Sequence, residues 1–198
     1  MFSRFKTKRA AYSVYLFSEF TLSLLFSMMF VADSVYQVSM VGLNALQLVL
    51  VGTTLEISAF LFEVPTGVIA DVYSRRLSII IGMFVMGLGF IVEGSFPFFA
   101  PILLAQVLWA LGYTFTSGAT EAWIADEVGE ARAGQAFLRA GQVGAIGSLI
   151  GIVPGMLLGL PGANIPIVLG GALLMALGAV LIVIMPETGF KPTPRENR

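Results

Sequence analysis

The side chains best suited to chemistry in this sequence are acids that stand inside long apolar stretches. Glu19 and Glu56 each lie near the middle of such a stretch, with no basic residue at a similar depth. Glu63 follows Glu56 by seven residues, which places it two turns further along the same face of a helix. A carboxylate in apolar surroundings must be protonated, face water or bind a cation. This face should therefore look into the protein or a cavity, where an acid carries protons or holds two helices together through hydrogen bonds.

A charged cluster follows the apolar stretch that contains Glu56. It consists of Gly67, Asp71 and the adjacent pair Arg75 and Arg76, with three uncharged residues in each gap. The glycine would let the end of a helix approach a neighbour, and the aspartate offers a hydrogen-bond acceptor. The two arginines can reach carboxylates on adjacent helices. An ordinary turn with a basic anchor would carry the same residues, so both interpretations stay open.

Glu121 and Arg139 form a second charged set. Each is expected about one helical turn inside the same end of its apolar span. An unpaired arginine at depth costs on the order of 3 kcal/mol by insertion scales, and Glu121 is the nearest acid by topology. We therefore predict an ion pair between them, which is either structural or part of a gate. Asp33 and Glu93 lie near the opposite ends of their spans, where exposure to water explains them.

Small residues recur every four positions in one later stretch, at Gly147, Gly151, Gly155 and Gly159. This is an extended form of the Gly-x-x-x-Gly face that lets two membrane helices pack closely. Four residues exceed one turn of 3.6 residues, so the stripe drifts by about 40° per step and winds gently round the helix. We predict that this stripe is a helix-packing face.

The composition places these residues in a membrane. Of 198 residues, 57% are hydrophobic and 12% are charged, and the mean hydropathy is +0.91. Soluble domains carry about 25% charged residues, so we predict an integral membrane protein. The chain has no Cys and no His, which excludes disulfides, thiol nucleophiles, imidazole metal sites and a His general base. We predict no enzymatic activity, no metal and no cofactor. The net charge of −1 argues against a nucleic-acid partner.

Six stretches are long enough to cross a bilayer core of roughly 30 Å as helices. They cover residues 11–32, 47–70, 76–95, 98–122, 137–160 and 164–185. Short loops join them, so the predicted fold is an all-α membrane protein, a bundle of six transmembrane helices. A basic N-terminus at 1–10 precedes the bundle at 11–185. The proline-rich and charged residues 186–198 are typical of the start of a cytoplasmic linker.

Lysine and arginine occur near only one end of each predicted span. The loops expected near 33–46, 95–97 and 161–163 contain neither residue. Since cytoplasmic loops retain positive charge during insertion, we predict that both termini are cytoplasmic. We expect the plasma (inner) membrane as the location.

The spaced cluster after the second stretch resembles a known signature. This is the loop Gly-x-x-x-Asp-(Arg/Lys)-x-Gly-x-(Arg/Lys)-(Arg/Lys) of the major facilitator superfamily. Gly67 and Asp71 match the pattern, and Arg75 and Arg76 supply its basic pair one residue early. Val72 stands where the family has a basic residue, and Ser74 stands in place of its second glycine.

The resemblance implies one half of such a fold, because full members pair two six-helix bundles. Two further features agree with it: Glu187 follows the sixth stretch in the sequence Met-Pro-Glu-Thr, and Glu121 follows Ser-Gly-Ala-Thr. The resemblance implies a latch at the cytoplasmic face, formed by Gly67, Asp71, Arg75, Arg76, Glu121, Arg139 and Glu187. It also implies that intramembrane acids couple substrate movement to protons, for which the candidates are Glu19, Glu56 and Glu63.

The glycine-rich stretch bears on the kind of transporter. Drug/proton antiporters of the family carry Gly-x-x-x-Gly-Pro-x-x-Gly-Gly there, and Gly147, Gly151 and Gly155 match it. Ile152 stands where that proline is expected, and Leu108 stands where the antiporter motif of the fourth helix has an arginine. Proton-coupled efflux is therefore one specific form of the prediction, and plain packing also explains the glycines.

We predict a secondary active transporter of a small solute, which works by alternating access and is present as its N-terminal half. The expected partners are membrane lipid, a small-molecule substrate and a second six-helix bundle, either a C-terminal half or another copy. The alternative is a structural or assembly subunit of the membrane that transports nothing.

Overall fold

Helices form every regular element in the described part of the chain. The structure is a computed structural model, and it describes residues 2–192. Its elements are α1 (Phe2–Val35), the π-helical turn η1 (Tyr36–Met40), α2 (Ala45–Val72), α3 (Arg75–Ser95), α4 (Phe99–Thr116), α5 (Ala119–Val128), α6 (Glu130–Gly159) and α7 (Asn164–Ile184). Within these residues, six segments are long and apolar enough to cross a membrane. The predicted all-α membrane fold is thereby confirmed.

Several boundaries differ from the sequence prediction, because hydropathy falls at the charged ends while the helices continue. α1 already begins within the predicted basic N-terminus, and α6 begins at Glu130 instead of residue 137. The fourth span runs on to Val128 but is divided into α4 and α5. The division falls at Gly118, whose φ of +70° is accessible to glycine without strain. The predicted linker at 186–198 is described only as far as residue 192, and its last six positions lie outside the described residues.

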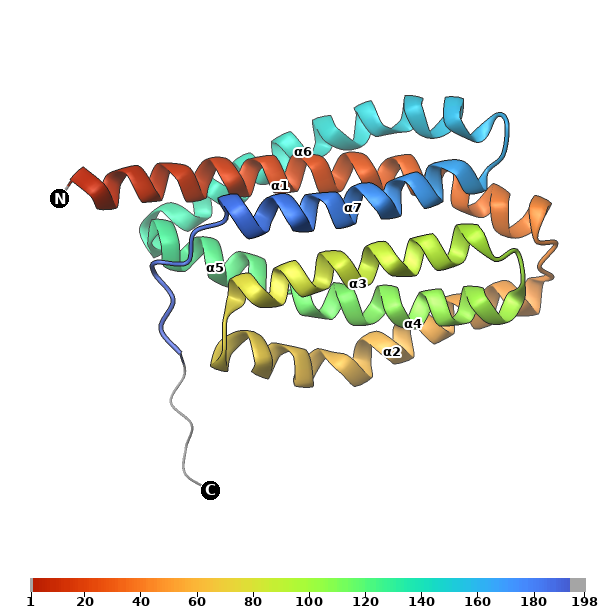
Figure 1. The fold of residues 1–198 in the computed structure, drawn as a ribbon, viewed down its shortest axis with the longest axis horizontal. Coiled ribbons are helices and arrows are strands. Elements are labelled where there is room, and N and C mark those ends of the chain that lie inside the picture. The colour runs from red at the N-terminus through yellow and green to blue at the C-terminus, as the bar shows by residue number, and fades with distance from the viewer. Residues whose placement is uncertain (1, 193–198) are drawn as a thin grey trace, which may run out of the picture.

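The helices lie side by side along one common direction (Figure 1). α1 packs most extensively against α6 and also contacts α7, while α3 lies between α7 and α4. α2 packs mainly on α4. The start of α1, the α2–α3 junction, the α5–α6 turn and the end of α7 all lie at one end of the bundle. We call this the basic end, because it holds Lys8, Arg9, Arg75, Arg76, Arg132 and Lys191.

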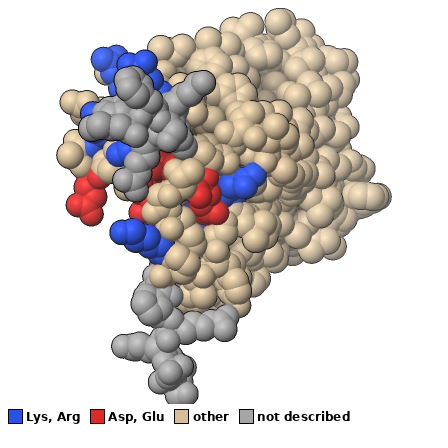
Figure 2. Space-filling model, turned by 60° about the vertical axis from the view of Figure 1, so that its left-hand side comes forward, with Lys and Arg blue, Asp and Glu red and all other residues tan. Residues whose placement is uncertain are grey.

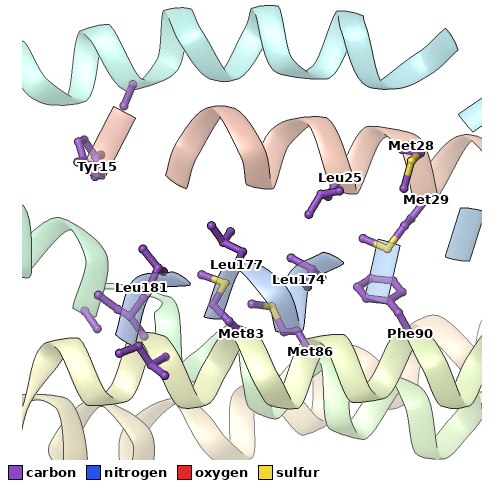
Figure 3. Close-up of a cluster of buried hydrophobic side chains, with 14 of the residues drawn as sticks. Tyr15, Leu25, Met28, Met29, Met83, Met86, Phe90, Leu174, Leu177 and Leu181 are labelled. Carbon is purple, nitrogen blue, oxygen red and sulfur yellow. The ribbon is translucent and has the colours of Figure 1, made fainter. Parts of the chain in front are cut away.

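A methionine-rich core joins α1, α3 and α7 (Figure 3). Met29 of α1, Met83 and Met86 of α3 and Leu174 of α7 are each at most 1% exposed. Unbranched thioether side chains fill irregular gaps between helices. This core fixes which side of α1 is covered by α3 and α7, and it leaves another side of α1 open for a cavity.

The glycine stripe of α6 faces α1. A Cβ atom on each of three glycines would meet a carbonyl oxygen of the α1 backbone: Phe20 for Gly147, Leu24 for Gly151 and Met28 for Gly155. At the end of the stripe, the space is wider, and the Cβ of Ala32 lies 3.9 Å from the position that a Cβ on Gly159 would take. The missing side chains let the two backbones approach closely. In this structure the stripe packs inside the bundle.

A buried polar cluster closes the end of the bundle opposite the basic end. Glu93 is 2% exposed, and its carboxylate accepts hydrogen bonds from the amides of Gln37 at 3.0 Å and Gln106 at 3.4 Å. Gln37 also donates to both oxygens of Asp33 at 3.2 Å, and the Tyr36 hydroxyl donates to the Glu93 carbonyl at 2.6 Å. The expectation that exposure to water explains Glu93 is wrong. The π-helical turn buries the consecutive residues Tyr36 and Gln37, which brings polar partners to this acid.

Gly151→Ala is expected to destabilise the bundle by about 1–3 kcal/mol. The added methyl group would overlap the α1 backbone, and a backbone segment cannot shift without disturbing its other contacts. Gly141→Ala is the matched control, since a Cβ there meets nothing within 4 Å and alanine favours the helix. Unfolding of the purified chain in mixed micelles, followed by circular dichroism as denaturing detergent is added, measures both. Equal stability of the two variants would contradict the close packing of α6 on α1.

Candidate functional site

Charged side chains gather at the basic end of the bundle. Figure 2 shows Lys, Arg, Asp and Glu there, beside a surface formed almost entirely by other residues. Four of the acids there come from three elements: Asp71 from α2, Asp126 and Glu127 from α5, and Glu187 from the segment that follows α7. Arg75 and Arg76 open α3 at the same place. Ends of several spans therefore meet in one charged network.

Arg75 is held between two acids. Its Nη1 donates to Oδ2 of Asp126 at 2.6 Å, whereas its Nη2 lies 3.7 Å from Oδ1 of Asp71. The side chain of Asp126 is 28% exposed and that of Asp71 is 57% exposed, so water weakens the second pair more. The guanidinium carbon of Arg75 also lies 5.9 Å from the ring centre of Phe190. Asp126 is the stronger partner of Arg75, although it lies beyond the predicted span, which ends at residue 122.

Glu187 caps the N-terminus of α3. Its carboxylate accepts hydrogen bonds from the Ser74 hydroxyl at 2.7 Å and from the backbone N–H of Arg76 at 2.9 Å. Ser74 in turn accepts from the N–H of Leu77 at 2.9 Å. A negative charge at a helix N-terminus is favoured because the first N–H groups there lack partners inside the helix. The Arg76 side chain reaches back and donates to the carbonyl of Ile182 near the end of α7.

The segment after α7 is also tied to α5. The Glu127 side chain is 3% exposed, and its carboxylate accepts from the Thr188 hydroxyl at 2.8 Å and from the N–H groups of Thr188 and Gly189. Trp123 donates its indole N–H to the carbonyl of Pro186 at 2.7 Å. Residues 186–189 are thus held between α3 and α5. Hydropathy does not reveal Trp123 and Glu127, because the predicted span ends at residue 122.

Glu121 lies in a cavity and not in this charged network. With Glu19 it lines a cavity of about 270 Å³ between α1 and the junction of α4 and α5. Among the described residues, the two ion pairs both involve Arg75, and none joins Glu121 to Arg139. The predicted Glu121–Arg139 pair is therefore absent from the described part of the chain. The break at Gly118 is the reason, because it starts a new helix whose first turn presents Glu121 beside α1.

The sequence of this chain is similar to a known family and to a bacterial relative. The family model of the Major Facilitator Superfamily matches residues 10–198. The chain belongs to the major facilitator superfamily. It is also 37% identical over 97 residues to the "Uncharacterized MFS-type transporter YxaM" of Bacillus subtilis (strain 168), an alignment that covers 48% of this chain and 24% of that protein. Family and fold support an integral membrane protein with a role in transport in general.

An aromatic cluster lies beside the cavity that contains Glu19 and Glu121. Phe26 of α1 and Tyr113 of α4 line the cavity. Behind them, Phe30 stacks on Phe26 with ring centres 5.6 Å apart, and Trp109 stacks on Tyr113 at 6.1 Å. Phe90 of α3 lies 6.1 Å from Phe26 and 6.2 Å from Trp109. These mutual contacts hold the rings that face the cavity in place.

Glu56, Glu63 and Gly67 lie apart from these contacts, as Arg139 does. Glu56 and Glu63 are exposed on α2, and neither lines the cavity that contains Glu19. In the superfamily loop, a Cβ on Gly67 would meet nothing within 4 Å in the described structure, so a close helix approach there does not explain the glycine. The expectation that the face of Glu56 and Glu63 looks into this chain's own interior is wrong.

Asp126→Asn is expected to destabilise the bundle by about 1–3 kcal/mol, because it removes the charged partner of a partly buried arginine. Asp71→Asn is the matched control and should cost less than about 1 kcal/mol, since that pair is longer and more exposed. A double-mutant cycle with Arg75→Gln, measured by unfolding in mixed micelles, separates the two couplings. A larger coupling to Asp71 than to Asp126 would reverse the assignment of the main partner.

Proposed function

We propose that this chain forms the N-terminal half of a secondary active transporter, which moves a small solute by alternating access against a second six-helix bundle. The observation that carries the proposal is the cavity between α1 and the α4–α5 junction, lined by polar, acidic and aromatic side chains. Tyr113 in its wall is 49% exposed, so the cavity is open on one side. A second bundle placed opposite that side would close it, as in transporters built from two repeated halves.

The matched relative supports a partner bundle. The same 97 aligned residues make up 48% of this chain and 24% of the relative, so the relative is about twice as long as this chain. That length leaves room for a second set of six spans. The second bundle is either a further part of the same polypeptide or another copy of this chain.

The charged network at the basic end supports a state-dependent latch. Arg75 with Asp126 joins the third span to the end of the fourth, and Glu187 joins the segment after α7 to the start of α3. Hydrogen bonds to charged groups contribute about 1.5–3 kcal/mol each, and 1.4 kcal/mol changes an equilibrium constant about tenfold. Making or breaking one such contact is enough to shift the balance between inward-open and outward-open states.

Glu19 is the proposed proton-coupling residue, in a transporter that works as a proton-coupled exporter. It is partly buried in the cavity wall, where a substrate and a proton can both reach it. Glu56 and Glu63 lie on the exposed face of α2, outside that cavity. Their proposed place is the surface that meets the second bundle.

We propose that the basic end faces the cytoplasm of a cell whose plasma (inner) membrane holds the protein. The chain has no native cysteine, so single cysteines can report its orientation. Cysteines at Ser39, Ser95 and Pro161, all exposed at the end opposite the basic end, should react with an impermeant thiol reagent added outside intact cells. Cysteines at Arg132 and Lys191 should react only after the membrane is opened. Labelling in the reverse order would overturn the orientation.

Transport itself is tested in proteoliposomes that contain this chain together with a second six-helix bundle. Saturable uptake driven by a pH gradient is expected, and Glu19→Gln should abolish its dependence on the gradient while exchange of substrate across the membrane persists. Glu130→Gln is the matched control, because this exposed acid at the start of α6 lies outside the cavity. If no combination of bundles shows saturable flux of any solute, the chain is an assembly subunit instead. Gradient dependence that survives Glu19→Gln would assign proton coupling to another group.

A further inference from the structure

We infer that the cavity between α1 and the α4–α5 junction binds an organic cation with an aromatic or bulky apolar body. The inference rests on the proposed transport function only in treating this cation as the substrate, because binding can be measured on the chain itself. Twelve described residues line the cavity, and the charged ones among them are Glu19 and Glu121. No Lys or Arg is among these lining residues, so the charged groups in the wall are all acidic.

The protein does not neutralise these two acids. Arg139 was the expected partner of Glu121, yet it does not line the cavity, and the ion pairs among the described residues involve Arg75 alone. Two carboxylates facing one small space disfavour each other's charge, and a cation between them relieves that repulsion. The unmet charge of the cavity is therefore negative.

Two neutral polar groups in the wall, Thr116 and Thr120, also favour a cation. Thr116 donates its hydroxyl hydrogen to the carbonyl of Tyr113 at 2.8 Å, and Thr120 donates to the carbonyl of Thr116 at 3.1 Å. A hydroxyl whose hydrogen is already committed offers its lone pairs to a ligand. These groups thus present acceptors to the cavity, and an anion would find no matching donors in them.

The aromatic wall indicates an organic cation. Tyr15, Phe26 and Tyr113 line the same space as the two acids, and the face of an aromatic ring attracts a cation. A metal ion is less suited, because the described residues contain no group of three or more acidic, His or Cys side chains that could hold one. The volume of about 270 Å³ is slightly smaller than a typical drug-sized site of about 300–1,000 Å³, as expected for one wall of a shared site.

The test compares two ions of nearly the same shape and opposite charge, tetraphenylphosphonium and tetraphenylborate. The purified chain in nanodiscs should bind tetraphenylphosphonium saturably in equilibrium dialysis, with empty nanodiscs to subtract partition into lipid. Glu19→Gln and Glu121→Gln should each weaken this binding by about tenfold, since each removes one charge-assisted contact. The double variant should show no saturable binding.

Three controls keep the result specific. Glu130→Gln, at an exposed acid outside the cavity, should leave binding unchanged. Glu19→Asp, which keeps the charge, should retain more binding than Glu19→Gln at an unchanged melting temperature. Tetraphenylborate should show no saturable binding to the native chain.

The inference is overturned if the native chain shows no saturable binding of tetraphenylphosphonium. It is also overturned if the double variant binds this ion as well as the native chain does, or if tetraphenylborate binds equally well. Saturable transport of an anion or a neutral solute in the two-bundle assay would overturn it while leaving the transport proposal intact. Conversely, if the chain binds tetraphenylphosphonium through Glu19 and Glu121 but supports no flux, the cation site stands and the transport proposal is wrong.

Discussion

The bend at Gly118 is the constraint on which the arrangement of the candidate site depends. A straight fourth span would continue the direction of α4 past Thr116, with no turn at which to re-aim the side chains that follow. The positive φ at Gly118 instead starts α5 as a separate helix. Its first turn then presents Glu121 to α1, and its last turn presents Asp126 and Glu127 to α3 and to the segment after α7.

α5 therefore joins the two parts of the candidate site within ten residues. One end of this short helix lines the cavity, and the other end is tied to Arg75 and residues 186–189. A rigid helix of three turns transmits a shift at one end to the other, because its backbone hydrogen bonds resist bending. In the proposed transporter, the cavity and the basic end therefore share this one short helix.

The sequence predicted the spans and the family well because both depend on local information. Long apolar runs mark the helices, and the spacing of Gly67, Asp71, Arg75 and Arg76 marks the superfamily loop. Sequence alone does not predict which way a side chain points around its helix axis, or how a bend re-aims the side chains that follow it. Glu121 and Arg139 were paired by depth alone, and Asp126 lay beyond the predicted span. Glu93 was assigned to water because a single sequence does not reveal the polar partners that Gln37 and Gln106 bring from other elements.

The polar cluster around Glu93 has a consequence for how the protein is made. Polar side chains are costly in a bilayer until they find partners, and chains emerge from the ribosome N-terminus first. When only α1 and α2 have been inserted, Gln37 has Asp33 but lacks Glu93, and Tyr36 lacks the carbonyl to which it donates. Glu93 arrives on α3, and Gln106 arrives on α4. The first four spans thus form the smallest nascent unit in which this cluster is complete, and a chain stalled earlier would present its unmet polar groups to the machinery that removes misassembled membrane proteins.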